Sequence, residues 1–382
     1  MEPVPRKTVL ISGAGIAGPT LAYWLARAGF EVTVVDQSRG ARSSGGPVDV
    51  RGEAVEVAAS MGVMPRLTEA ATRVREMRVV DGSGRVVATM DLMPSRRASG
   101  SREVEILRSR LAAILTEAAR PDAEFLFDES IQDLDQGPAG VDVTFASGRQ
   151  ERFDLVVGAD GLHSNVRRLV FAPEAEVVRH LGLFIAGLPL LEGVEDPGVV
   201  LMYNTPGTSV AIHPAGGEPV AAFIFRGSAQ EGFDGRDQDR QKQVVCEAYA
   251  GAGWRVPELL EGLRATGDLY FDSVSEVRLA RWSKGRVVLV GDAASCVSLF
   301  GEGSSLAMVG AHTLARTLAE TSDHALAFTR YEAIHRATCG PKQRGAWVAA
   351  RILVPATRPG LVLRNFALRA VAGARRVTRA GS

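Results

Sequence analysis

Apolar runs alternate with amphipathic stretches in the first part of the chain. Residues 9–12 form an apolar run typical of a buried strand, a helix-like stretch continues to about Ala28, and residues 32–35 form a second apolar run. Two later apolar runs, within residues 154–168 and 287–294, also end in small residues followed by aspartate. Strands separated by helices in this order predict an α/β fold with a Rossmann-like domain.

The middle of the chain follows a different pattern. Residues 74–92 and 181–226 contain short apolar runs broken by turn sequences, which predict an inserted, mostly antiparallel sheet. We expect this sheet to cover a substrate. Because strand side chains alternate between two faces, about half of its large side chains should line a cavity and the others should be ordinary core. The candidates for the substrate wall are Met202, Tyr203, His213, Phe223 and Phe225.

The first predicted strand is followed by glycines at GxGxxG spacing, and each has a physical role. Gly13 permits a tight turn, Gly15 lets a pyrophosphate approach the backbone, and Gly18 lets the next helix pack closely on the strand. The start of that helix, at Ile16 and Ala17, would offer unpaired N–H groups to phosphates. The alternative is an ordinary tight turn, but the order of strand, glycines, helix, strand and acid favours dinucleotide binding.

An acidic residue closes the second predicted strand. Asp36 can accept hydrogen bonds from both ribose hydroxyls, which disfavours a 2′-phosphate at this site. With the adjacent Gln37, we expect it to hold the ribose of an ADP-containing cofactor other than NADP. No second GxGxxG and no CxxC follow, which argues against disulfide reductases with two nucleotide-binding domains.

Composition narrows the remaining function classes. The 382-residue chain has 44 basic and 44 acidic residues, so a general attraction to nucleic acid or to an anionic membrane is not expected. Three dispersed cysteines predict neither a disulfide framework nor a metal site and favour a reducing cytoplasm. No apolar stretch approaches the roughly 18 residues of a spanning helix.

Three segments, combined with the glycine motif, resemble a known family. They are EILRSRLAAIL (residues 105–115), DLVVGADGLHSNVRR (154–168) and VVLVGDAA (287–294). The series is similar to the class A flavin-dependent aromatic hydroxylases, which have the para-hydroxybenzoate hydroxylase fold and include tetracycline-inactivating monooxygenases. The likeness spans most of residues 8–335. It implies a discontinuous FAD-binding domain (1–72, 100–175 and 275–330), a substrate-binding sheet domain (73–99 and 176–274) and C-terminal helices (331–382).

The resemblance assigns cofactor roles around the GDAA segment. Asp292, after Gly291, would reach the ribityl and pyrophosphate part of FAD. The following loop would start a helix whose N–H groups face the flavin pyrimidine ring and stabilise negative charge on the reduced flavin. That segment comprises Phe300, Gly301, Glu302, Gly303, Ser304 and Ser305, and Phe300 is also a candidate for the substrate wall.

The same resemblance implies two further cofactor contacts. Arg108 would contact the phosphate or ribityl chain, while Asp160 and Gly161 would lie near the pyrophosphate and the approach of the nicotinamide donor. The ordinary alternatives are a solvated helix cation for Arg108 and a strand-end turn residue for Asp160.

The segment SSGGPVDVRG (residues 43–52) matches the part of tetracycline-type hydroxylases that covers the flavin. Its polar members are Asp49, placed toward the cofactor, and Arg51, placed toward the substrate; a surface ion pair between them is the alternative. Arg42 would reach the adenine end of FAD.

The resemblance implies an FAD-dependent monooxygenase without a nucleophilic side chain or a metal. It would use NADPH or NADH and O2 to hydroxylate an aromatic or polyketide-like small molecule, in secondary metabolism or antibiotic modification, as a monomer or weak homodimer. One departure matters: the family has an aromatic residue or histidine and then a proline after GDAA, whereas this chain has SCVSLF and is one residue shorter. The alternatives are therefore a same-fold flavoprotein that catalyses oxidation, reduction or cyclisation without O2, and a flavin-binding protein without turnover.

The end of the chain is strongly basic. After Glu332 there are nine arginines, one lysine and no acidic residue. Spaced arginines among apolar residues predict helices that lie against a domain with their guanidinium groups in water. Docking to a membrane surface or nucleic acid, and attraction of an anionic donor such as NADPH, are the alternatives.

Overall fold

The computed structural model describes residues 6–40, 46–92, 102–228, 237–296 and 302–366. Its first sheet has the strand order β17-β18-β11-β1-β2-β7, and all neighbours are parallel except β17 and β18. Consecutive apolar side chains on the central strands point to both faces of this sheet and are buried. The sheet is therefore covered on both faces, as is usual for parallel strands. The strands are β1 (Thr8–Ser12), β2 (Glu31–Asp36), β7 (Glu124–Phe127), β11 (Leu155–Gly158), β17 (Ser283–Lys284) and β18 (Val287–Leu289).

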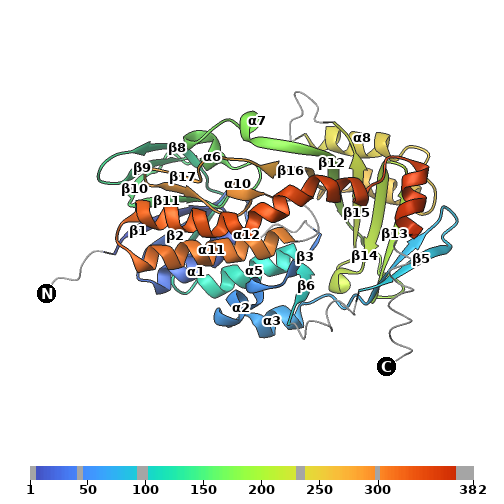
Figure 1. Cartoon of the computed structure of the whole chain (residues 1–382), viewed down its shortest axis with the longest axis horizontal. Coiled ribbons are helices and arrows are strands. Elements are labelled where there is room, and N and C mark those ends of the chain that lie inside the picture. Colours follow the sequence, from blue (N-terminus) through green and yellow to red (C-terminus); the bar gives the residue numbers. More distant parts are fainter. Residues whose placement is uncertain (1–5, 41–45, 93–101, 229–236, 297–301, 367–382) are drawn as a thin grey trace.

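Four helices lie together beside this sheet (Figure 1). Helix α1 (Ala17–Arg27) packs against α5 (Arg108–Ala119) and α11 (Glu302–Glu320), and α12 (His324–Leu353) packs on α11. A two-stranded ribbon of β3 (Pro47–Val50) and β6 (Val104–Leu107) adjoins the start of α11, together with α2 (Glu53–Ser60) and α3 (Met64–Glu69).

The second large sheet has the order β16-β12-β15-β14-β13-β4-β5. Its neighbours are antiparallel except β4 and β13, which run parallel. The strands are β4 (Glu76–Val80), β5 (Val86–Asp91), β12 (Val178–Pro189), β13 (Val199–Thr205), β14 (Thr208–His213), β15 (Val220–Arg226) and β16 (Tyr270–Val277). Helices α8 (Gln238–Ala248) and α9 (Val256–Ala265) cover one face with an apolar core.

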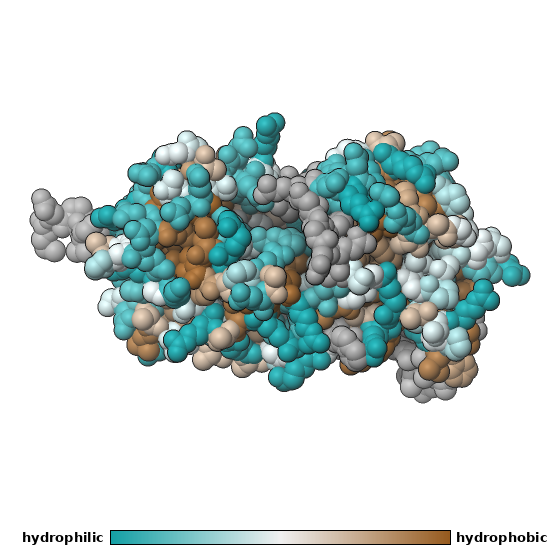
Figure 2. Space-filling view, turned by 90° about the horizontal axis from the view of Figure 1, so that it is seen from above, coloured by the Kyte–Doolittle hydropathy of each residue, from teal (hydrophilic) through white to brown (hydrophobic). Residues whose placement is uncertain are grey.

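Helix α12 connects the two halves of the molecule. It starts against α11 and ends against the second sheet, where Ala350 and Val354 bury Leu183 and Val274. Figure 1 shows this helix running along the long axis of the molecule, from the first sheet on the left toward the second sheet on the right. In Figure 2 the face seen from above is mainly hydrophilic, and one apolar patch lies on the left half.

The predicted fold class is confirmed: a Rossmann-like α/β unit carries an inserted, mostly antiparallel sheet. Two features were not predicted from the sequence. They are strand β16 and the small antiparallel sheet of β8 (Ile131–Gln136), β9 (Val141–Phe145) and β10 (Gln150–Phe153). In the described ranges, we find no helix with the length and apolar content needed to cross a membrane.

Candidate cofactor site

The glycine turn after β1 has the geometry that its spacing predicted. Gly13 has φ +111°, and a Cβ atom on it would lie 2.4 Å from the Ala159 carbonyl oxygen. A Cβ on Gly18 would lie 1.9 Å from the Gly13 oxygen, so only glycine permits this close approach of helix and turn. Gly15 instead has open space around its missing Cβ. The turn is therefore tight at both ends and open in the middle, where a phosphate needs access to the backbone.

The helix start and the acid complete this half of the site. Helix α1 begins at Ala17, and no side chain caps its first turn at Ile16. Asp36 accepts hydrogen bonds from the Ala14 N–H (2.7 Å) and the Ser38 N–H (2.8 Å), which fix its carboxylate beside the glycine turn. Gln37 is exposed, and Arg42 lies outside the described residues.

The tip of β18 meets the start of α1, although the two are far apart in sequence. Gly291 has φ +65°, and a Cβ atom there would lie 3.0 Å from Ala17 Cβ and 3.7 Å from Ala307 Cβ. The next residue, Asp292, is half-buried and begins the short helix α10 (Asp292–Ser295). The two glycine-rich strand ends thus form one continuous surface.

Arg108, the first residue of α5, adds a half-buried positive charge to this surface. Burial alone would lower the pKa of Arg108, but the nearby Tyr270, Asp292 and Asp272 raise it above its usual range. Burial raises the pKa of Asp292, and the Arg108 charge opposes that rise. Among the described residues, the guanidinium of Arg108 makes no hydrogen bond or ion pair. Its donors are therefore free for an anionic or hydroxylated ligand.

The start of α11 is tied to β3. The Ser304 and Ser305 hydroxyls donate to the Asp49 carbonyl oxygen at 2.6 and 2.8 Å, and the Arg51 N–H donates to Ser305 Oγ at 3.0 Å. Arg51 also lies 3.3 Å from the Asp49 carboxylate and 3.4 Å from that of Glu302. The ion pair considered as an alternative for Asp49 and Arg51 is thus present, in half-buried surroundings. Gly303 is in the first turn of α11, whereas Phe300 and Gly301 lie outside the described residues.

Asp160 organises the turn between β11 and α6 (Asn165–Val170). Its half-buried carboxylate accepts hydrogen bonds from the Val166 N–H (3.0 Å), the Ser164 hydroxyl and the Ser12 hydroxyl. Burial raises the pKa of Asp160, while these donors and Arg167 oppose the rise. This geometry matches the strand-end turn role, and Gly161, with φ +82°, completes the turn.

The substrate-wall candidates divide between the two faces of the second sheet. Tyr203, Phe223 and Phe225 belong to the apolar core beneath α8 and α9. Strand alternation directs these three side chains toward α8 and α9, where they form part of the apolar core. We therefore leave them out of the proposed substrate wall. Met202 shares the opposite face with His213, as their register with β14 and β15 shows.

His213 lies at the junction of the two domains. Its Nε2 atom is 3.3 Å from the Glu105 carboxylate on β6, and its Nδ1 atom accepts a hydrogen bond from the Ala215 N–H at 2.9 Å. The Thr72 hydroxyl also donates to Glu105. Sequence reasoning missed Glu105 and Thr72, because nothing local marks a contact between residues so far apart.

Two residues of β16 were also missed. Tyr270 and Asp272 share the face opposite Phe271, which packs with the core under α8 and α9, and they approach Arg108 and Asp292. The alternating pattern YFDSVSEV is the only signal that could have predicted this strand.

A separate hollow of about 670 Å³ lies elsewhere, against α12 and β17. Its walls include Phe171, Leu279, Lys284 and Phe328, and none of its residues belongs to the site above. The parallel sheet and the glycine turn after β1 together define the class of dinucleotide-binding proteins.

Comparison with known proteins identifies the family. A family model described as FAD binding domain matches residues 6–328. A flavin-dependent monooxygenase of Legionella longbeachae is 35% identical over 354 residues, which are 91% of this chain and 90% of the relative. An uncharacterised protein of Mycobacterium tuberculosis is 38% identical over 349 residues, 90% of this chain and 93% of the relative. The crystal structure of the tetracycline destructase Tet(51) matches with a TM-score of 0.83 at 30% identity, over 96% of both chains.

The chain therefore belongs to the flavin-dependent monooxygenases with an FAD binding domain. The site residues fit that cofactor: Gly15 leaves room for a pyrophosphate, the Asp36 carboxylate lies beside the glycine turn, and the free donors of Arg108 lie near the half-buried Asp292. The Tet(51) likeness agrees with the predicted class A flavin monooxygenase fold.

Proposed function

We propose that this protein uses NADPH or NADH and O2 to hydroxylate an aromatic or polyketide-like small molecule. The observation that supports this most is the junction of Gly291 with Ala17, which brings the two proposed halves of an FAD site together next to an unpaired, half-buried Arg108. The substrate would be held between this site and the inner face of the second sheet. Bound FAD supplies the redox chemistry and the activation of O2.

The roles of the chain's residues follow from their positions. The open backbone at Gly15 and the uncapped start of α1 would bind the pyrophosphate, and Asp36 would accept hydrogen bonds from the ribose. Arg108 and Asp292 would hold the ribityl chain. In this proposal the first turn of α11 directs its N–H groups at the flavin pyrimidine ring, where they stabilise negative charge.

Met202 and His213 are the wall residues that we retain, and Arg51 is the third candidate, at the edge of β3. Their side chains would orient an aromatic substrate and exclude water from the reacting centre. The hydrophobic body of Met202 suits a flat ring, and the imidazole of His213 suits a hydroxyl or carbonyl group.

The test is a turnover experiment with isotope-labelled oxygen. Purified protein loaded with FAD would be mixed with NADPH or NADH and a panel of aromatic and polyketide compounds. A substrate should stimulate NAD(P)H consumption, and 18O2 should place one labelled atom in the product. An unlabelled product would instead indicate a same-fold flavoprotein that does not oxygenate, and a protein that takes up no FAD would contradict both.

A further inference from the structure

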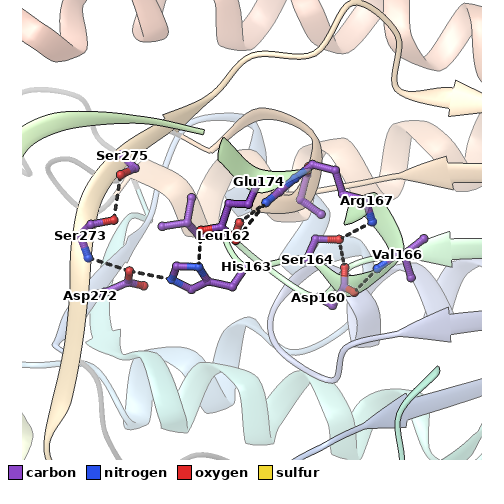
Figure 3. A network of polar contacts seen from close by, with 11 residues as sticks. Asp160, Leu162, His163, Ser164, Val166, Arg167, Glu174, Asp272, Ser273 and Ser275 are labelled. Atoms are coloured by element: carbon purple, nitrogen blue, oxygen red, sulfur yellow. Dashed lines mark hydrogen bonds and ion pairs between the residues drawn. The ribbon is translucent and has the colours of Figure 1, made fainter. Parts of the chain in front are cut away.

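His163 joins the FAD domain to the second sheet through two carboxylates. It lies in the turn between β11 and α6, and Figure 3 shows its ring between Glu174 and Asp272. The Nδ1 atom is 2.9 Å from Glu174 of α7 (Glu174–Val177), and the Nε2 atom is 3.2 Å from Asp272 of β16. An imidazole can donate from both nitrogens only when it is protonated, so this geometry selects the cation.

The charge environment of His163 agrees with that geometry. The hydrogen bonds to Asp272 and Glu174 raise the pKa of His163 to about 10, against the opposing effect of burial. Arg167 is the other cation nearby, 3.9 Å from Glu174, and it donates to the Leu162 and Ala293 carbonyl oxygens. His163 is therefore positively charged across the physiological range, although more than half of its side chain is exposed.

Asp272 faces a second cation as well. Strand alternation places Asp272 on the same face of β16 as Tyr270, and its charge contributes to the raised pKa of Arg108. The Asp272 carboxylate also accepts a hydrogen bond from the Ser273 N–H at 2.7 Å. Asp272 thus contacts His163 directly and is close enough to Arg108 for their charges to interact.

We infer that His163 is a positioning residue that keeps Arg108 free for the cofactor by binding and neutralising Asp272. Without His163, the Asp272 carboxylate would pair with Arg108 and compete with the phosphate or ribityl group of FAD. This inference rests on the proposed role of Arg108 in FAD binding. In this inference β16, a strand of the second sheet, affects the affinity of the first domain for FAD.

The test compares FAD affinity in three variants by flavin fluorescence titration of the apoprotein at pH 7.5. His163→Gln should weaken FAD binding about tenfold, the size of ordinary coupling within one network of charges. Asp272→Asn should bind FAD within about twofold of the wild-type protein. The double variant should recover the affinity of Asp272→Asn, because the competing carboxylate is gone.

The recovery separates this inference from a purely structural role. If His163 only braces the two domains, the double variant binds FAD as weakly as His163→Gln, and the inference is overturned. Unchanged affinity in His163→Gln overturns it too. His324→Gln, at the start of α12, is the matched control and should bind FAD normally. Failure of the wild-type protein to bind FAD would refute the proposed function itself.

A second measurement covers the case in which His163→Gln does not fold. Glu174→Gln keeps the contact between His163 and Asp272 but removes one of the two acids that hold the proton. FAD affinity should then match the wild-type protein at pH 6 and fall below it at pH 9. Equal affinities at both pH values would contradict the inference.

Discussion

At the scale of single residues, the three motif glycines have different tasks. Gly13 and Gly18 are required by sterics, since a Cβ atom on either would overlap backbone atoms. Gly15 has open space, so its absent side chain matters only to a ligand. The sequence spacing predicted the steric roles of Gly13 and Gly18, because the motif is local and its geometry follows from the turn itself. The contact of Gly15 with a pyrophosphate stays a prediction.

This contrast gives a first prediction. Gly18→Ala should lower the free energy of unfolding of the apoprotein by about 1–3 kcal/mol, because the added methyl group overlaps the Gly13 carbonyl. Gly15→Ala should leave the stability of the apoprotein unchanged and weaken FAD binding. Chemical denaturation and FAD titration measure the two effects, and equal stability losses in both variants would contradict the assignment.

Arg108 gives a second prediction at this scale, through the pKa of Asp292. Burial makes the pKa of Asp292 higher in the folded protein than in the unfolded chain. At pH values between these two pKa values the folded state binds more protons, so the free energy of unfolding falls as the pH rises through this interval. Arg108→Ala removes the positive charge that opposes this rise, so it should widen the interval between the folded and unfolded pKa values of Asp292. The variant should therefore lose on the order of 1–3 kcal/mol more stability at pH 8 than at pH 5. A pH-independent loss, measured by urea unfolding, would exclude this coupling.

At the scale of elements, the first turn of α11 is fixed to β3 by hydroxyl groups. Ser304 and Ser305 both donate to the Asp49 carbonyl oxygen. The resemblance placed this helix start at the flavin, but it did not predict that its serines would be used for the attachment. Strand β16 was missed because a polar, eight-residue alternation gives a weak signal beside the strong apolar runs of β1 and β18.

The attachment of α11 gives a third prediction. Replacing both Ser304 and Ser305 by alanine should cost about 1 kcal/mol of stability for each lost hydrogen bond. Because the helix start would lose its fixed position, the reduced flavin should be less stabilised and the midpoint potential of bound FAD should fall. Spectroelectrochemical titration measures the potential. Thr313→Ala, farther along α11, is the control and should leave it unchanged.

At the scale of the whole molecule, the two domains meet through contacts between residues distant in sequence. His163 with Asp272 and His213 with Glu105 each join the first domain to the second sheet. Ala350 and Val354 of the α12 end bury part of the same sheet. Periodicity predicted the two layers separately, but it carries no information on which side chains meet across them. For the same reason the sequence named five wall candidates but did not show that Met202 and His213 lie on the face opposite the three core aromatic residues.

The domain junction gives a fourth prediction. Val354→Asp would place an unpaired charge in the apolar contact between α12 and the second sheet, and it should destabilise the protein by about 3 kcal/mol or more. Hydrogen exchange should then increase in β12 and β16 and change little in β1. Uniform acceleration in all strands would show that the two sheets unfold as one unit.

The central claim is that the strand ends of β1 and β18 bind one molecule of FAD together. The most direct measurement is a crystal structure of the protein grown with FAD. The pyrophosphate should lie on the turn from Gly13 to Gly18, and the ribityl chain should lie between Asp292 and Arg108. Density for the cofactor that contacts only one of these strand ends, or that lies in the hollow beside Phe328, would contradict the account.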